Sequence, residues 1–172
     1  MSATVDLNEA DVFGALRAWM LGILPPGAEV IKTQDNRVPM PARGTTFATL
    51  NNVHQRRLST NQPSWDSTNG MDMMPTEYQI QIDAYGPDAG EWAQMLMSLS
   101  RAADVNDNWP AGVRMLYIDD GIQLPMIAGE HQFEARWKLQ AFIQYNPTTT
   151  RPMPTMTQAQ VGLREIDTTF TP

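Results

Sequence analysis

Several residue types and patterns are missing from this 172-residue chain, and each absence excludes a kind of function. There is no cysteine, which excludes disulfides, thiolate catalysis and cysteine-ligated zinc. No stretch approaches the roughly 20 apolar residues that span a bilayer. The first residues, MSATVDLNEADVF, lack the basic start of a signal peptide. We therefore expect a soluble protein, made in a cytoplasm and without membrane contact.

Basic residues are also scarce. The chain has 12 Lys and Arg against 19 Asp and Glu, a formal net charge of −7. Proteins that grip nucleic acid through its phosphates need clustered Lys and Arg. Here the only adjacent basic pair is Arg56-Arg57, which we expect to decorate an exposed strand edge. This balance argues against a protein that grips nucleic acid through phosphate contacts, but it is compatible with DNA that must slide past without sticking.

Recognisable catalytic patterns are lacking as well. The two histidines, His54 and His131, lie in strand-like runs without a partner at metal-ligand spacing, and Glu130 would point to the opposite sheet face from its neighbour. The pair Asp119-Asp120 precedes a glycine and is better explained by a turn than by a cation site. There is no phosphate-binding glycine loop, G-x-S-x-G elbow or H-E-x-x-H. We predict no catalytic, cofactor-binding or metal-binding residues and hence no enzyme.

The clearest positive pattern lies at residues 77–99, where the hydrophobic period changes from two to about four. Residues 77–85 alternate between polar and apolar, which predicts a half-buried strand. A helix over 88–103 follows, with Asp88 and Glu91 spaced as a capping box. Its apolar face is formed by Trp92, Met95, Leu96 and Leu99. A strand followed directly by an amphipathic helix favours an α+β architecture.

Further elements follow from the same reasoning. Residues 6–24 have the apolar period of a helix, with Asp6 and Glu9 as a possible capping box. Strands are expected at 29–33 and 45–57, with a turn bracketed by Pro39 and Pro41 between them.

The second half of the chain is richer in strands. The polar stretch 58–72 is either the tip of a long hairpin or a disordered excursion. Strands at 113–118 and 122–127 are expected to be joined by a tight turn at the Asp-Gly step. Pro125 places the second of these strands at an edge or a bulge.

Residues 131–145 form the longest alternating run. A strand of that length extends roughly 50 Å, and it is much longer than the usual strand of about five or six residues. It therefore projects into a hairpin, pairs with a neighbouring subunit, or bends at a bulge.

Composition changes at residue 147. The stretch after it is rich in Pro and Thr, and a weak apolar pattern returns at Val161, Leu163, Ile166 and Phe170. This pattern indicates either an arm that docks on an adjacent copy or a frayed tail. Taken together, we expect an α+β core domain over 1–146, with a mixed or largely antiparallel sheet packed against two main helices. An extended C-terminal arm over 147–172 completes the chain.

Three motifs, taken in order, resemble a known family. They are the Q-D-N-x-x-P segment at Gln34, Asp35, Asn36 and Pro39, the D-x-Y-G-P-x-A junction at Asp83, Tyr85, Gly86, Pro87 and Ala89, and the Q-Y-N-P ending at Gln144 to Pro147. With the N-terminal helix VFGALRAWMLGILP before them, they resemble the neck or tail-terminator proteins of long-tailed bacteriophages. The resemblance covers most of residues 7–147.

The resemblance implies a structural virion protein. Such a subunit forms a homo-oligomeric ring, six-fold by resemblance, that caps the tail tube and joins it to the head–tail connector. DNA would pass through its lumen, and the protein would be found in the virion neck, at the head-proximal end of the tail, after assembly in the host cytoplasm. Other hypotheses are a head–tail joining or minor tail protein of the same virion, a monomeric module that presents loop 58–72 to a ligand, and a carboxylate-dependent hydrolase around Asp119 and Asp120.

Overall fold

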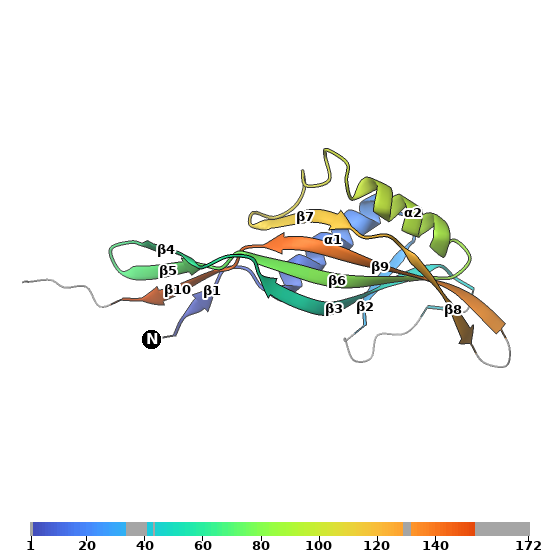
Figure 1. Ribbon diagram of the computed structural model, residues 1–172, viewed down its shortest axis with the longest axis horizontal. Coiled ribbons are helices and arrows are strands. Elements are labelled where there is room, and N and C mark those ends of the chain that lie inside the picture. Colours follow the sequence, from blue (N-terminus) through green and yellow to red (C-terminus); the bar gives the residue numbers. More distant parts are fainter. Residues whose placement is uncertain (1, 34–40, 43, 129–131, 154–172) are drawn as a thin grey trace, which may run out of the picture.

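The chain folds into two β-sheets and two helices, which confirms the α+β prediction (Figure 1). The computed structural model describes residues 2–33, 41–42, 44–128 and 132–153, with only the backbone described at 125–128 and 132–134. The elements in chain order are β1 (Thr4–Val5), α1 (Glu9–Ile23), β2 (Glu29–Lys32), β3 (Phe47–Arg57), β4 (Gln62–Trp65), β5 (Asn69–Met73), β6 (Thr76–Tyr85), α2 (Ala89–Leu99), β7 (Val113–Ile118), β8 (Ile122–Ala128), β9 (Gln132–Tyr145) and β10 (Thr148–Pro152).

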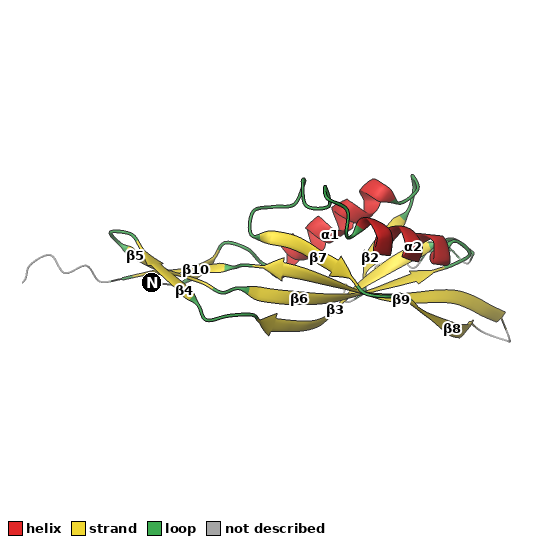
Figure 2. Cartoon of the chain, turned by 45° about the horizontal axis from the view of Figure 1, so that its top comes forward, coloured by secondary structure: helices red, strands yellow, loops and turns green. Residues whose placement is uncertain are grey.

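The larger sheet has six strands and forms the body of the molecule. Its order is β2-β3-β6-β9-β7, and β8 also pairs with β9. Only β2 and β3 are parallel, and the other pairs are antiparallel, so the sheet is mixed as predicted. Both helices lie on one face of this sheet (Figures 1 and 2). The opposite face carries no helix of the described chain.

The core lies between the helices and the covered face. Alternate residues of the two central strands point into it, as the period of two predicted. These strand residues are Tyr78, Ile80, Ile82, Ala84, Leu139, Ala141, Ile143 and Tyr145. The helices contribute Val12, Phe13, Leu16, Met20, Ala89, Trp92, Ala93 and Leu96. Of the predicted face of α2, Trp92 and Leu96 are buried, Met95 is half-buried and Leu99 is exposed, and Ala89 and Ala93 complete the buried stripe.

Both predicted capping boxes were wrong. Helix α1 begins at Glu9 and is capped by Asn8, whose Oδ1 accepts from the backbone N of Ala10, while Asp11 accepts from the backbone N of Asn8. Asp88 makes no side-chain cap for α2, because its Oδ2 accepts from Thr46 Oγ1 at 3.1 Å instead. A partner distant in sequence competes successfully with the local one.

The expected hairpin between 113–118 and 122–127 was also wrong. Strands β7 and β8 do not pair with each other but lie one after the other along β9, with Ile118 opposite Ala141 and Ile122 opposite Lys138. The backbone N of Asp119 donates to Gln140 O and keeps the connection close to β9. The long strand β9 thus meets β8 in a hairpin at its start. Pro125 lies on an edge strand of the described sheet, as predicted.

The second sheet, of order β1-β10-β5-β4, projects from one end of the body (Figure 1). Residues 58–72 contain β4 and most of β5, so the hairpin alternative is confirmed, although neither strand was predicted. The third strand, β10, belongs to the segment that follows residue 147 and pairs with β5 and β1. The predicted turn at 39–41 and the apolar residues Val161 to Phe170 lie, wholly or in part, outside the described residues.

Candidate assembly surfaces

The candidate catalytic residues are dispersed. His54 is exposed on β3, and Asp119 and Asp120 follow β7 in a turn where Asp120 N donates to Asp119 Oδ1 at 2.9 Å. Strands β6 and β9 separate β3 from β7, a distance of roughly 14 Å across the sheet. Glu130 and His131 lie outside the described residues. Within the described ranges, no group of three or more His, Asp or Glu side chains is placed to hold a metal ion.

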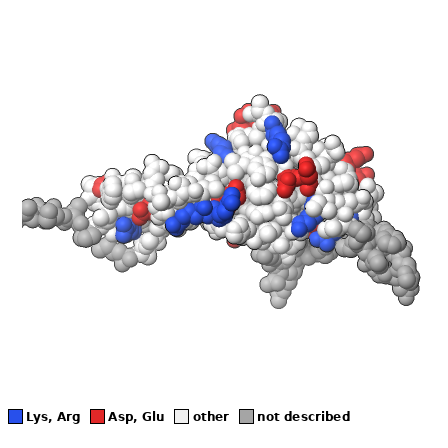
Figure 3. Space-filling view, viewed as in Figure 1, with Lys and Arg blue, Asp and Glu red and all other residues white. Residues whose placement is uncertain are grey.

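The basic pair occupies an exposed strand end, as predicted. Arg56 Nη2 pairs with Glu77 Oε1 at 2.9 Å, and Arg57 is also exposed. Figure 3 shows positive and negative side chains interspersed over the visible face, without a broad area of one sign. Such a face has no strongly attractive field for a polyanion.

The projecting sheet is the most exposed part of the described chain. All four residues of β4 are exposed, and 65% of Trp65 is accessible to solvent. None of the residues in the hydrophobic core comes from β1, β4, β5 or β10. A small sheet of this kind normally needs an apolar face or a covering helix to be stable. We call β1, β4, β5 and β10 the projecting sheet hereafter.

Polar contacts hold the projecting sheet together at its tip and at its base. At the tip, Asp66 accepts from the backbone N of Thr68 and of Asn69, which lowers the pKa of its carboxyl to about 2. At the base, Asp6 Oδ1 accepts from Thr148 N at 2.7 Å. These contacts order the strands locally, but they bury little apolar surface.

The helix-free face of the larger sheet combines polar side chains, most of them paired, with the stacked aromatic pairs Phe47–Tyr85 and Tyr117–Phe142. Gln79 Nε2 donates to Gln140 Oε1 at 2.7 Å. Asp83 accepts from Gln81 through one oxygen and from Arg136 through the other. Because these groups satisfy one another, this face offers little unmet hydrogen-bonding capacity.

Two tyrosines lie under the start of α1. Burial, reinforced by the nearby Glu9 carboxylate, raises the pKa of Tyr78 to about 12. Burial and the carboxylates of Asp11, Asp6 and Glu9 also raise the pKa of Tyr145. The Tyr145 hydroxyl donates to Leu7 O at 2.7 Å, and Asn52 donates to the Tyr78 hydroxyl. The Tyr145 bond ties the residues just before α1 to the sheet, and the Asn52 bond links β3 with β6.

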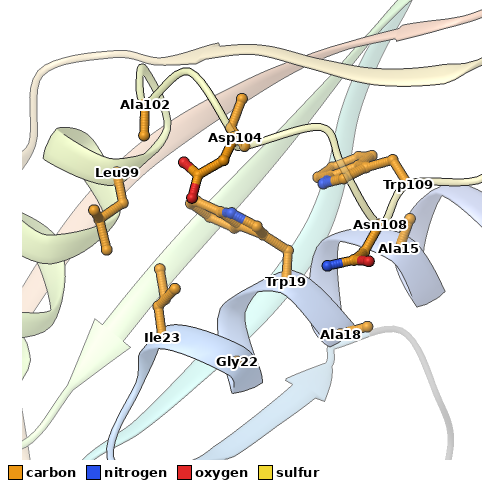
Figure 4. Close-up of a pocket in the computed structure, with 11 residues that line it drawn as sticks. Ala15, Ala18, Trp19, Gly22, Ile23, Leu99, Ala102, Asp104, Asn108 and Trp109 are labelled. Atoms are coloured by element: carbon orange, nitrogen blue, oxygen red, sulfur yellow. The ribbon is translucent and has the colours of Figure 1, made fainter.

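A groove of about 300 Å³ lies between α1 and the loop that follows α2 (Figure 4). One wall consists of small residues of α1, namely Ala15, Ala18 and Gly22. Most of the remaining lining is apolar, and its largest side chains are Trp19 and Trp109. Asp104 and Asn108 supply the polar part of the lining.

The loop that walls the groove is fixed to the sheet. The side-chain amide of Asn106 bonds to the backbone of Met115 as a neighbouring strand would. Its Nδ2 donates to Met115 O, and its Oδ1 accepts from Met115 N at 2.7 Å. Ser100 Oγ accepts from Ile118 N. The groove is therefore preformed. Sequence reasoning missed it, because residues 100–112 have no regular period and Asn108 and Trp109 are brought to α1 only by the tertiary fold.

In the described chain, the notable features are thus surfaces for contact, and they define a structural, assembly-type protein. The chain belongs to the phage neck terminator protein family, whose model matches residues 10–170. No curated protein matches it. The family match confirms the predicted resemblance and assigns the chain a structural role in the phage neck, and with it a place in the virion. Neither described helix has the length and apolar character needed to cross a membrane.

Proposed function

We propose that this chain is the repeating subunit of a ring that caps the finished tail tube and joins it to the head connector. Six copies, as the sequence resemblance implies, would surround a lumen through which DNA passes without sequence-specific binding. The six-stranded sheet and the two helices of the core over 1–146 would form the wall of the ring. In the segment 147–172, β10 pairs within its own chain, and the residues after it would reach toward a neighbouring copy.

The projecting sheet is the observation that supports this proposal. It extends from the body, has no share in the hydrophobic core, and exposes Trp65 and Val5. Exposed aromatic residues are enriched in protein–protein interfaces. The edge strand β4 pairs only with β5 in the described structure and so has backbone groups available to a neighbour. A ring contact would give this sheet the cover that the described residues of its own chain do not supply.

The dispersed carboxylates and the mixed surface charge fit a role that is geometric rather than chemical. The acidic composition suits a lumen that DNA must traverse without adhering. Presentation of loop 58–72 by a monomer has less support, because these residues form two strands of a sheet rather than a free loop.

Electron microscopy of negatively stained protein, alone and with tail tubes of the same phage, tests the proposal. Rings, or density at one end of each tube, are expected. A dispersed monomer that ignores the tubes would contradict it. Adding the protein to tube subunits during polymerisation separates the terminator from its nearest alternative. A terminator shortens the length distribution of the tubes, whereas a head–tail joining protein leaves it unchanged.

A further inference from the structure

We propose that the groove between α1 and the loop 102–109 binds the C-terminal segment 154–172 of a neighbouring copy. This inference rests on the proposed ring, because it requires a second copy at close range. A ring could form without this contact, so the contact can be tested separately.

The groove has the form of a peptide-binding site. The small residues Ala15, Ala18 and Gly22 recur along one side of α1 and leave room for an incoming chain. Trp19 and Trp109 provide apolar walls, and Leu99 remains 39% exposed beside them. Since Asn106 holds the loop in place, little ordering of the groove is needed when an occupant enters.

Trp109 supplies an independent sign of a missing occupant. Its side chain is 92% buried, as 8% is exposed, yet its Nε1 has no hydrogen-bond acceptor among the described residues. Figure 4 shows this nitrogen turned toward the middle of the groove, toward Asp104 and Trp19. A buried donor without an acceptor is costly. The nitrogen itself has less than 1 Å² of accessible surface, so a small movement of the indole would be needed before a backbone carbonyl of a peptide in the groove could satisfy it.

The C-terminal segment suits the site in composition. Residues 154–172 carry large apolar side chains at Val161, Leu163, Ile166 and Phe170 within a mainly polar stretch. The segment has one basic residue, Arg164, and two acidic residues, Glu165 and Asp167, and Asp104 in the groove offers a carboxylate to Arg164. An apolar side chain in the groove and an arginine beside it would use both features.

The path of the chain favours a neighbouring copy over the same one. Strand β10 runs away from the body, and the described chain ends at Met153 in the projecting sheet, whereas the groove lies on the helix side of the body (Figures 1 and 4). When extended, residues 154–172 span roughly 60 Å. A segment of that reach could extend from the projecting sheet to a body packed beside it in a ring.

The natural absence of cysteine allows a direct test in the full-length protein. We would introduce Ala18→Cys in the groove together with Leu163→Cys in the segment, oxidise the protein, and separate the products on a non-reducing gel. The matched control places the first cysteine at Gly14, an exposed position of the same helix outside the groove. Covalent dimers and larger multimers are expected at about tenfold or more the yield of the control.

Equal yields from the two pairs would overturn the inference, and so would a disulfide formed only within one chain. Trp109→Phe provides the second measurement. It removes the orphaned donor together with part of a buried indole, so the free subunit should lose some stability but remain folded, while the cross-linked fraction should fall by roughly five- to tenfold. An unchanged fraction would overturn the proposed hydrogen bond.

The same samples distinguish this inference from the proposed function. Rings that form without preferential cross-linking at Ala18 would overturn the groove contact and leave the ring intact. Cross-linked multimers that fail to cap tubes would support the contact and contradict the terminator function.

Discussion

The two sheets of this protein differ in how much of each is buried in a hydrophobic core. In the six-stranded sheet, every second residue of the central strands is buried against a helix. In the projecting sheet, strand β4 is exposed along its whole length and no residue joins the core. The comparison teaches that the body has the means to fold alone, whereas the projecting sheet has the properties of a surface that is completed by assembly.

The largest expected effect is a contrast between stability and assembly. Leu139→Ala removes a fully buried side chain of β9 and should lower the free energy of unfolding by about 2–5 kcal/mol. Trp65→Ala on the projecting sheet should change it by no more than about 0.5 kcal/mol but reduce ring formation. Urea unfolding and electron microscopy measure the two effects. A Trp65 variant that unfolds as readily as the Leu139 variant would remove the distinction between the sheets.

Glycines sharpen the same comparison at smaller magnitude. Gly86 follows β6 with φ +99°, and a Cβ there would lie 2.7 Å from Thr45 O, so Gly86→Ala should cost roughly 1–3 kcal/mol. Gly70 lies in the projecting sheet, where a Cβ would meet the flexible end of Met153. Gly70→Ala should therefore cost about 0.5 kcal/mol or less. Thermal unfolding of both variants provides the measurement, and equal losses would contradict the expectation.

The sequence predicted most of the body and little of the projecting sheet, for a physical reason. Burial on one face imposes alternation, so β6 and β9 could be recognised from their residues alone. Strand β4 is exposed to solvent throughout, and most residues of β5 are only half-buried, so neither strand shows this alternation. Hydrophobic alternation therefore reveals a strand only where one face of that strand is buried in a core.

Errors within the body have a different cause, which is competition between distant partners. Thr46 takes the Asp88 carboxylate away from the predicted cap, although 42 residues separate the two. Strand β9 offers enough length for β7 and β8 in succession, so the Asp-Gly step does not close a hairpin. The groove could not be predicted for the same reason, because Trp109 and Ala18 are distant in sequence and come together only in the folded chain.

Alkaline pH should weaken the body in particular. The pKa of Tyr78 is raised to about 12 in the folded chain from an ordinary value of 10.0, so the folded state holds this proton more tightly than the unfolded state. The associated stability is complete below about pH 10 and is lost as pH rises toward 12. Tyr78→Phe should flatten this dependence in urea unfolding followed across that interval. An equally steep dependence in the variant would assign the effect to other groups, of which Tyr145 is the first to test.

The smallest expected effect lies at the tip of the projecting sheet and should leave the body untouched. Asp66 is fully exposed, and hydrogen bonds from the backbone of Thr68 and Asn69 lower its pKa to about 2. A lowered pKa means that the carboxylate supports the β4–β5 turn above the ordinary value of 3.8, and that this support is lost as pH falls through 2. Amide hydrogen exchange at Thr68 and Asn69 should therefore quicken in Asp66→Ala at neutral pH, while exchange in β6 and β9 stays the same. If the core amides quickened with the tip, the two sheets would unfold as one unit, and the projecting sheet would depend on its own chain rather than on a neighbour.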